Sequence, residues 1–161
     1  MSERLEAHQQ KLAASRAKLN DALDRIGDRG DEQIYSEGAQ WTLRQLVIHL
    51  VLADVGHNRM LYHYAEGKEF IPADYDLERY NKRSVEKKVE MTLEQARGSL
   101  AQSRQELLEW FDKQADDSFL DKEGRHATLR MMTLSQIIDV MCGHEEGHAN
   151  DILAMLTSAD S

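Results

Sequence analysis

The sequence predicts an all-α protein built as a four-helix bundle, and three observations support this fold class. The 161 residues contain one proline, Pro72, and nine glycines, so long helices can form along almost the whole chain. Apolar residues recur at helical spacing rather than alternately. The pattern Thr-Leu-x-Gln begins at Thr42, Thr92 and Thr133, and each copy matches a capping box at a helix start. A chain of this length is expected to form one domain over residues 1–161.

These helix starts and the spacing of the apolar residues along the chain predict four long helices. The first is predicted from about Glu3 to Ile26, because apolar residues recur every seven positions along one face and Gly27 ends the helix. The second runs from Thr42 toward Gly67 and is apolar on more than one side, so it should be the most buried. The third and fourth are predicted over residues 92–114 and 133–156.

The connection between the second and third helices is unusually long. It has about 24 residues, 68–91, with a short extra helix predicted near Leu77 to Lys88. A tight antiparallel hairpin would need only about 2–8 residues. We therefore expect the second and third helices to run parallel, with the insert crossing one end of the bundle. The later link, residues 115–132, is charged and is expected to lie exposed on the surface.

Charge and cysteine content exclude several classes of protein. The chain has 20 basic and 29 acidic residues, a formal net charge of −9 and no block of lysine and arginine, so binding to nucleic acid is not expected. No apolar run approaches the roughly 18 residues of a membrane span, and no signal peptide is recognised. Cys142 has no partner for an internal disulfide and is predicted to be a packed thiol. We expect a cytoplasmic protein with no membrane contact.

Two of the seven histidines share one face of the fourth helix. His144 and His148 lie four residues apart, the spacing that two imidazoles need to bind one metal ion. The apolar seam through Leu134, Ile137 and Met141 continues onto this pair, so both histidines occupy core positions. Two buried rings are costly unless their nitrogen atoms are paired. Either each ring bonds to a neighbouring helix, or one metal ion satisfies both.

A catalytic zinc-type site usually has three protein ligands, and His49 is the best candidate for the third. His49 lies about 10 Å inside the second helix, while His148 and His144 lie about 13 and 19 Å before the end of the fourth. These levels coincide only if the two helices are antiparallel. His63 lies about 21 Å beyond His49 and cannot reach the same ion. The remaining histidines are interpreted as packing or surface residues: His8, His57 and His126.

Residues 144–148 also match His-Glu-x-x-His, the zinc-protease signature in which Glu145 would activate a metal-bound water. No further histidine or glutamate follows at the spacing of such enzymes, so a protease is the least favoured interpretation. Glu145 is a candidate for a general base or for a residue that orients a ligand ring, but a solvated charge on the helix surface is the favoured interpretation. Glu146 should face away, and Asp151 lies close enough to the histidine face to orient a ligand ring.

The chain resembles the DinB/YfiT-like metal-binding helical bundles, the DinB superfamily, over nearly its whole length. The resemblance rests on the segment Trp41 to Leu50, the insert Asp76 to Asn81, the Gly124-Arg-His126 motif and the final helix with its histidine pair. It implies a four-helix bundle of up-down-down-up order, often homodimeric. It also implies that His49, His144 and His148 match the three metal-binding histidines of the family.

The resemblance implies a divalent metal ion, zinc or nickel, with open coordination positions at one end of the bundle. Related proteins include metal-dependent hydrolases and transferases or isomerases that use a low-molecular-weight thiol. We therefore predict a metal-dependent enzyme of hydrolase or thiol-dependent transferase type acting on a small molecule, with Tyr75, Tyr80 and Asn81 near the mouth of its site. The alternative is a non-catalytic helical dimer that binds a metal or ligand, or packs its histidines without metal.

Overall fold

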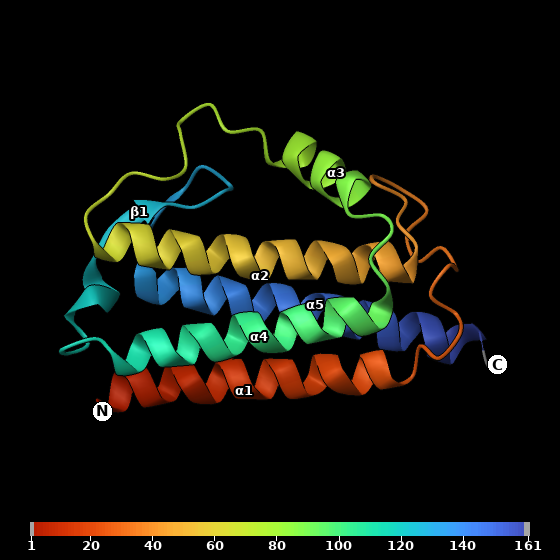
Figure 1. The fold of residues 1–161 in the computed structure, drawn as a ribbon, viewed down its shortest axis with the longest axis horizontal. Coiled ribbons are helices and arrows are strands. Elements are labelled where there is room, and N and C mark those ends of the chain that lie inside the picture. The colour runs from red at the N-terminus through yellow and green to blue at the C-terminus, as the bar shows by residue number, and fades with distance from the viewer. Residues whose placement is uncertain (1, 160–161) are drawn as a thin grey trace.

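The computed structural model describes residues 2–159, which form a bundle of four long helices with a shorter helix beside it (Figure 1). The helices are α1 (Glu3–Asp24), α2 (Leu43–Ala65), α3 (Leu77–Lys87), α4 (Leu93–Asp112) and α5 (Leu134–Ala159). A 3-10 helix, η1 (Ser118–Asp121), precedes the antiparallel strands β1 (Glu123–Arg125) and β2 (Met131–Thr133). The predicted fold class is confirmed. No helix in the described residues is long and apolar enough to cross a membrane.

Local hydrogen bonds define the starts of α2, α4 and α5. The amide of Gln45 donates to the Thr42 hydroxyl at 3.2 Å, and the amide of Thr42 donates to the Gln45 side chain at 3.0 Å. The same reciprocal bonds form at the other two predicted capping boxes. At the opposite ends, Gly27 and Gly67 follow α1 and α2 with φ angles of +57° and +76°. A left-handed residue of this kind stops a helix, so these limits follow from the nearby sequence.

Two apolar clusters establish the direction of each helix. One joins the N-terminal halves of α1 and α5 to the C-terminal halves of α2 and α4: Leu5, Leu12, Met60, Leu61, Leu107, Phe111, Leu134 and Ile137. The other joins the opposite halves: Leu19, Ile26, Leu43, Leu46, Ala96, Leu100, Ile152 and Leu156. Thus α1 and α5 run one way, and α2 and α4 run the other way (Figure 1). The up-down-down-up order is confirmed, with α2 and α5 antiparallel.

The insert follows α2 instead of crossing one end of the bundle. Since α2 and α4 are parallel, the chain leaving the end of α2 must return to the end of the bundle where α2 began. The 23 residues of α2 span about 34 Å, and the insert with α3 covers this distance alongside α2 (Figure 1). The prediction of a crossing at one end was wrong. The insert instead forms an outer wall along one side of the bundle.

The link between α4 and α5 is not the exposed segment that its charge predicts. Phe119 and Leu120 of η1 are buried, and Met132 of β2 is also buried. Gly124 lies so close to the Tyr64 ring that an added Cβ atom would approach it to 2.2 Å. The link therefore folds as a small hairpin against α2. Its apolar runs are only two residues long, too short for periodicity to reveal.

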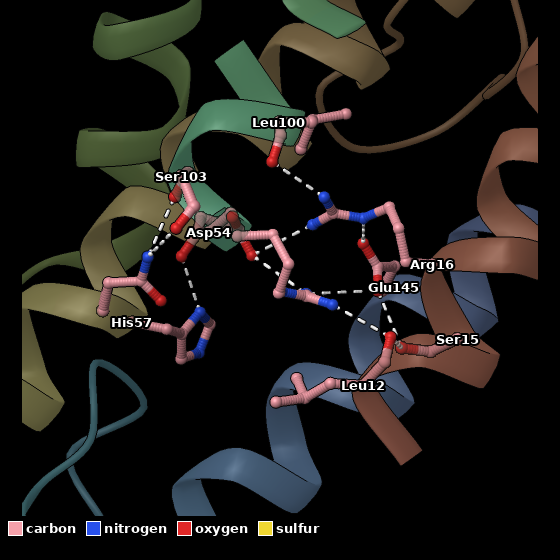
Figure 2. Close-up of polar contacts among 11 residues, drawn as sticks. Leu12, Ser15, Arg16, Asp54, His57, Leu100, Ser103 and Glu145 are labelled. Atoms are coloured by element: carbon pink, nitrogen blue, oxygen red, sulfur yellow. Dashed lines mark hydrogen bonds and ion pairs between the residues drawn. The ribbon is translucent and has the colours of Figure 1, made fainter. Parts of the chain in front are cut away.

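A layer of polar side chains, whose contacts Figure 2 shows, lies between the two apolar clusters. We define the polar layer as Arg16 of α1, Asp54 of α2, Arg104 of α4 and Glu145 of α5, all buried. Arg16 contacts both acids and donates to the carbonyl of Leu100, while Arg104 contacts both acids and donates to the carbonyl of Leu12. The polar layer thus joins all four long helices at one level of the bundle.

Candidate metal centre

The side chains of His49, His144 and His148 converge, and we refer to them as the histidine triad. Nε2 of His144 lies 3.1 Å from Nε2 of His49 and 3.2 Å from Nε2 of His148. Ligand atoms of all three residues lie within 4.8 Å of one another. Zinc holds imidazole nitrogens at about 2.0–2.1 Å, which places them about 3.3 Å apart in tetrahedral geometry. The donor atoms of the triad therefore fit a divalent ion.

The antiparallel packing of α2 and α5 brings the triad together. His49 lies in the second turn of α2, and the other two histidines lie in successive turns of α5. The depths calculated along the two helices from the sequence predict this meeting. Trp41, just before α2, packs its ring against His49 with centroids 4.6 Å apart.

Tyr35 fixes the orientation of the His148 ring. The Tyr35 hydroxyl donates to Oδ2 of Asp151 at 2.6 Å, and its oxygen lies 2.8 Å from Nδ1 of His148. Because the phenol proton is given to Asp151, Nδ1 of His148 donates to Tyr35, and Nε2 keeps its lone pair for a metal ion. Asp151 therefore orients the ligand ring through Tyr35. No pattern in the sequence indicates Tyr35, which lies 113 residues from His148.

Burial keeps the triad in the neutral form that metal binding requires. Burial, followed by the neighbouring His148, lowers the pKa of His49 to about 3 and the pKa of His144 to about 2. Burial also lowers the pKa of His148, against an opposing effect of Asp151. At neutral pH the triad therefore presents uncharged nitrogen donors.

Replacing Tyr35 with phenylalanine should weaken metal binding about 10- to 100-fold, the usual effect of losing a partner that orients a ligand. The variant keeps the ring but loses the hydroxyl that joins His148 to Asp151. Competition between metal-free protein and a chromophoric chelator for zinc measures the affinity. Tyr62→Phe is the matched control, because the Tyr62 hydroxyl has no hydrogen-bond partner among the described residues. Equal affinity of the Tyr35 variant and the unaltered protein would contradict this role.

A cavity of about 500 Å³ lies beside the triad, between α2, the insert and the turn after β1. His49 and His144 line it, whereas His148 does not. Tyr75, Tyr80 and Asn81 also line the cavity, as predicted, but it lies along the side of the bundle and not at one end. The reason is the path of the insert beside α2. A hollow of about 550 Å³ between the start of the insert and β1 contains none of the histidines.

His57 and His126 form a separate hydrogen-bonded pair in the cavity wall. Nδ1 of His57 donates to the carbonyl of Ala53, so its Nε2 accepts from Nε2 of His126 at 2.8 Å. Nδ1 of His126 accepts from the amide and hydroxyl of Thr128. Burial lowers the pKa of His126 to about 4. Both neutral rings are therefore fully hydrogen-bonded without metal, as expected for His57. The surface interpretation of His126 was wrong, because the hairpin buries it.

Glu145 is buried, so its interpretation as a solvated charge was wrong. Its carboxylate accepts hydrogen bonds from Ser15 and Arg16 of α1 within the polar layer (Figure 2). These contacts direct Glu145 toward α1 and give no support to a role as catalytic base or to the protease interpretation. Glu146 is exposed and pairs with Lys18 of α1, as predicted.

The other candidates have ordinary packing roles. Nδ1 of His63 donates to the carbonyl of Arg59, and its ring packs against Phe70. His8 is buried, with its Nε2 2.8 Å from the Ser135 hydroxyl. Cys142 is a buried thiol whose pKa is raised by burial, as predicted for a packed cysteine.

Comparison with known proteins agrees with the observed fold. A family model described as the DinB superfamily matches residues 5–152. A crystal structure of the mycothiol-dependent maleylpyruvate isomerase superposes with a TM-score of 0.70 at 14% identity. A histidine-to-alanine mutant of that enzyme gives a TM-score of 0.70 at 13% identity. Both matches cover 94% of this chain but 63% of the isomerase chain. At this identity the likeness establishes the fold alone. Comparison with curated proteins finds no match.

Proposed function

The chain belongs to the DinB superfamily, and we propose that it is a metal-dependent enzyme acting on a small molecule. The observation that carries the proposal is the convergence of the Nε2 atoms of His49, His144 and His148 beside a largely apolar cavity. Three neutral imidazoles are typical of catalytic zinc sites, in which one coordination position stays open. Imidazole also suits nickel, so zinc and nickel are the metals to test.

A divalent ion at this site would lower the pKa of a bound water or thiol and so supply a nucleophile at neutral pH. The chain's own residues supply the geometry. Tyr35 and Asp151 hold the His148 ring with its Nε2 atom toward His144. Two members of the triad, His49 and His144, line the cavity, where apolar and aromatic side chains can enclose a small substrate.

Metal analysis combined with an activity screen tests the proposal. Protein purified without an affinity tag should contain about one divalent ion per chain, or take one up from solution. The metal-loaded protein is then screened for hydrolysis of ester and amide substrates, with chelator-treated protein and the His49→Ala variant as controls. Turnover that needs both the metal and His49 supports the proposal. Stoichiometric metal in both His49→Ala and His148→Ala proteins would contradict the ligand assignment.

Use of a low-molecular-weight thiol is a second candidate, favoured by the fold similarity to an enzyme named as mycothiol-dependent. The same preparations are tested for consumption of mycothiol, bacillithiol or glutathione in the presence of an electrophile. Thiol consumption that requires metal supports the transferase type. Turnover at the same rate without added thiol would contradict it and favour hydrolysis.

The non-catalytic alternative makes a different prediction about stability. A ligand that binds only the folded state raises the melting temperature. If the triad packs without metal, a chelator should leave the melting temperature of the purified protein unchanged, and added zinc should not raise it. Metal-dependent stabilisation without turnover in either screen would favour a binding protein.

A further inference from the structure

The side chains that line the cavity beside the triad differ in charge from the chain as a whole. The chain carries 29 acidic residues and a formal net charge of −9. Yet within residues 2–159 no aspartate or glutamate lines the cavity, and Arg59 is its only lysine or arginine. Arg59 is exposed, and no acidic side chain in the described residues pairs with it. An arginine without an acidic partner at the edge of an apolar cavity is available to an anion from solution.

The acidic side chains of α2 and α5 form their contacts with groups that do not line the cavity. On α5, Asp139, Glu145 and Glu146 form ion pairs with Lys11, Arg16 and Lys18 of α1. Asp151 of α5 accepts from Tyr35, and the one acid of α2, Asp54, lies in the polar layer. The packing of α2 and α5 therefore keeps the acidic side chains of these two helices out of the cavity lining.

The insert as a whole has six basic and six acidic side chains, but its helix α3 adds positive charge beside the cavity. Three residues of α3, Leu77, Tyr80 and Asn81, line the cavity. This helix carries four basic and two acidic side chains, although the chain as a whole is acidic. A local excess of positive charge beside a cavity raises the local concentration of anions and the rate at which they bind.

The space between Arg59 and the triad suits an apolar group. Leu52, Val55 and Gly56, which lie between His49 and Arg59 on α2, line the cavity. Arg59 lies ten residues after His49 on α2, about 15 Å along the helix axis. A ligand that reaches both ends therefore needs an extended apolar or aromatic body.

We infer that the cavity takes an organic anion with an apolar body, whose anionic group binds Arg59 while its other end faces His49 and His144. A guanidinium binds carboxylates and phosphates in two-pronged geometry, so either anion satisfies the chemistry. This inference names the substrate class of the proposed function and rests on that function only for the claim that the bound anion reacts.

Binding of 6-phenylhexanoate and of its neutral amide, 6-phenylhexanamide, measured by isothermal titration calorimetry, tests the inference. Metal-free protein is used first, so that direct binding of the carboxylate to a metal ion cannot produce the preference. The unaltered protein should bind the carboxylate about tenfold more tightly than the amide. Arg59→Met should bind both with similar affinity. Arg25→Met is the matched control, since Arg25 is an exposed arginine of the α1 end paired with Asp21, and it should keep the preference.

Equal binding of carboxylate and amide to the unaltered protein, absence of binding by both probes, or an unchanged preference in Arg59→Met would each overturn the inference. Hexyl phosphate, measured in the same way, distinguishes the two kinds of anion. The result is independent of the proposed function. An Arg59-dependent preference in a protein without metal-dependent turnover would support the anion site and contradict the proposed enzymatic function. Metal-dependent turnover without the preference would support the enzymatic function and contradict the anion site.

Discussion

Replacing His144 with alanine should reduce zinc affinity by more than about 100-fold, beyond the effect of losing an orienting partner. His144 occupies the centre of the triad, because its Nε2 lies within 3.2 Å of the Nε2 atoms of both other histidines. Its loss leaves two donors on different helices, too few for the three-ligand site typical of catalytic zinc. Elemental analysis of protein purified without a tag, followed by competition with a chromophoric chelator, measures the loss.

His63→Ala is the matched control for this substitution. His63 also lies on α2, but 14 residues, or about 21 Å, beyond His49, and its Nδ1 is engaged by the carbonyl of Arg59. The control should keep full metal content. Circular dichroism of the metal-free variants separates loss of a ligand from loss of the fold. If folded His144→Ala bound zinc as tightly as the control, the triad would not be the metal site.

Replacing Glu145 with glutamine should destabilise the protein by about 3–5 kcal/mol, the usual effect of removing one member of a buried ion pair. Glutamine preserves the shape of the side chain but leaves Arg16 and Arg104 with Asp54 as their one remaining acidic partner in the polar layer. Urea unfolding of the metal-free protein, followed by circular dichroism, measures the change. A loss below about 1 kcal/mol, the range of exposed ion pairs, would contradict the importance of this contact.

Glu146→Gln is the matched control. Glu146 follows Glu145 on α5 and also pairs with a side chain of α1, Lys18, but this pair is exposed. Exposed pairs contribute about 0–1 kcal/mol, so this variant should unfold nearly as the unaltered protein does. A double variant, Arg16→Met with Glu145→Met, provides a further test. It should be less destabilised than the sum of the two single variants, because each single change leaves a buried charge without its partner.

The helix starts and the triad were predictable because their signals are local or periodic. Each capping box involves residues three apart, and the Thr133 start of α5 was identifiable from four consecutive residues. The triad needed one further step, the antiparallel arrangement of α2 and α5, which the depth of the histidines within their helices suggested. The family resemblance agreed with the same arrangement.

The errors concern residues whose surroundings come from distant parts of the chain. Glu145 looks like a surface charge in its own helix, and only the packing of α1 brings Arg16, 129 residues earlier, against it. His126 lies within a charged link, and only the hairpin brings it against His57, 69 residues earlier. In both cases the local sequence does not show which polar groups a distant element supplies.

The sequence by itself determined the all-α fold class, the limits of the long helices and the three histidines that meet between α2 and α5. Hydrogen bonds between residues three or four apart and the period of the helix are sufficient for the fold class and the helix limits, and the depth of the histidines within antiparallel helices adds the triad. The tertiary structure alone decided that Tyr35 holds His148, that a polar layer divides the core, and that the acidic side chains of α2 and α5 stay out of the cavity lining around Arg59. The physical reason is that an acidic chain can place its charges on either face of the bundle, and only the packing of the helices determines which face becomes the wall of the cavity.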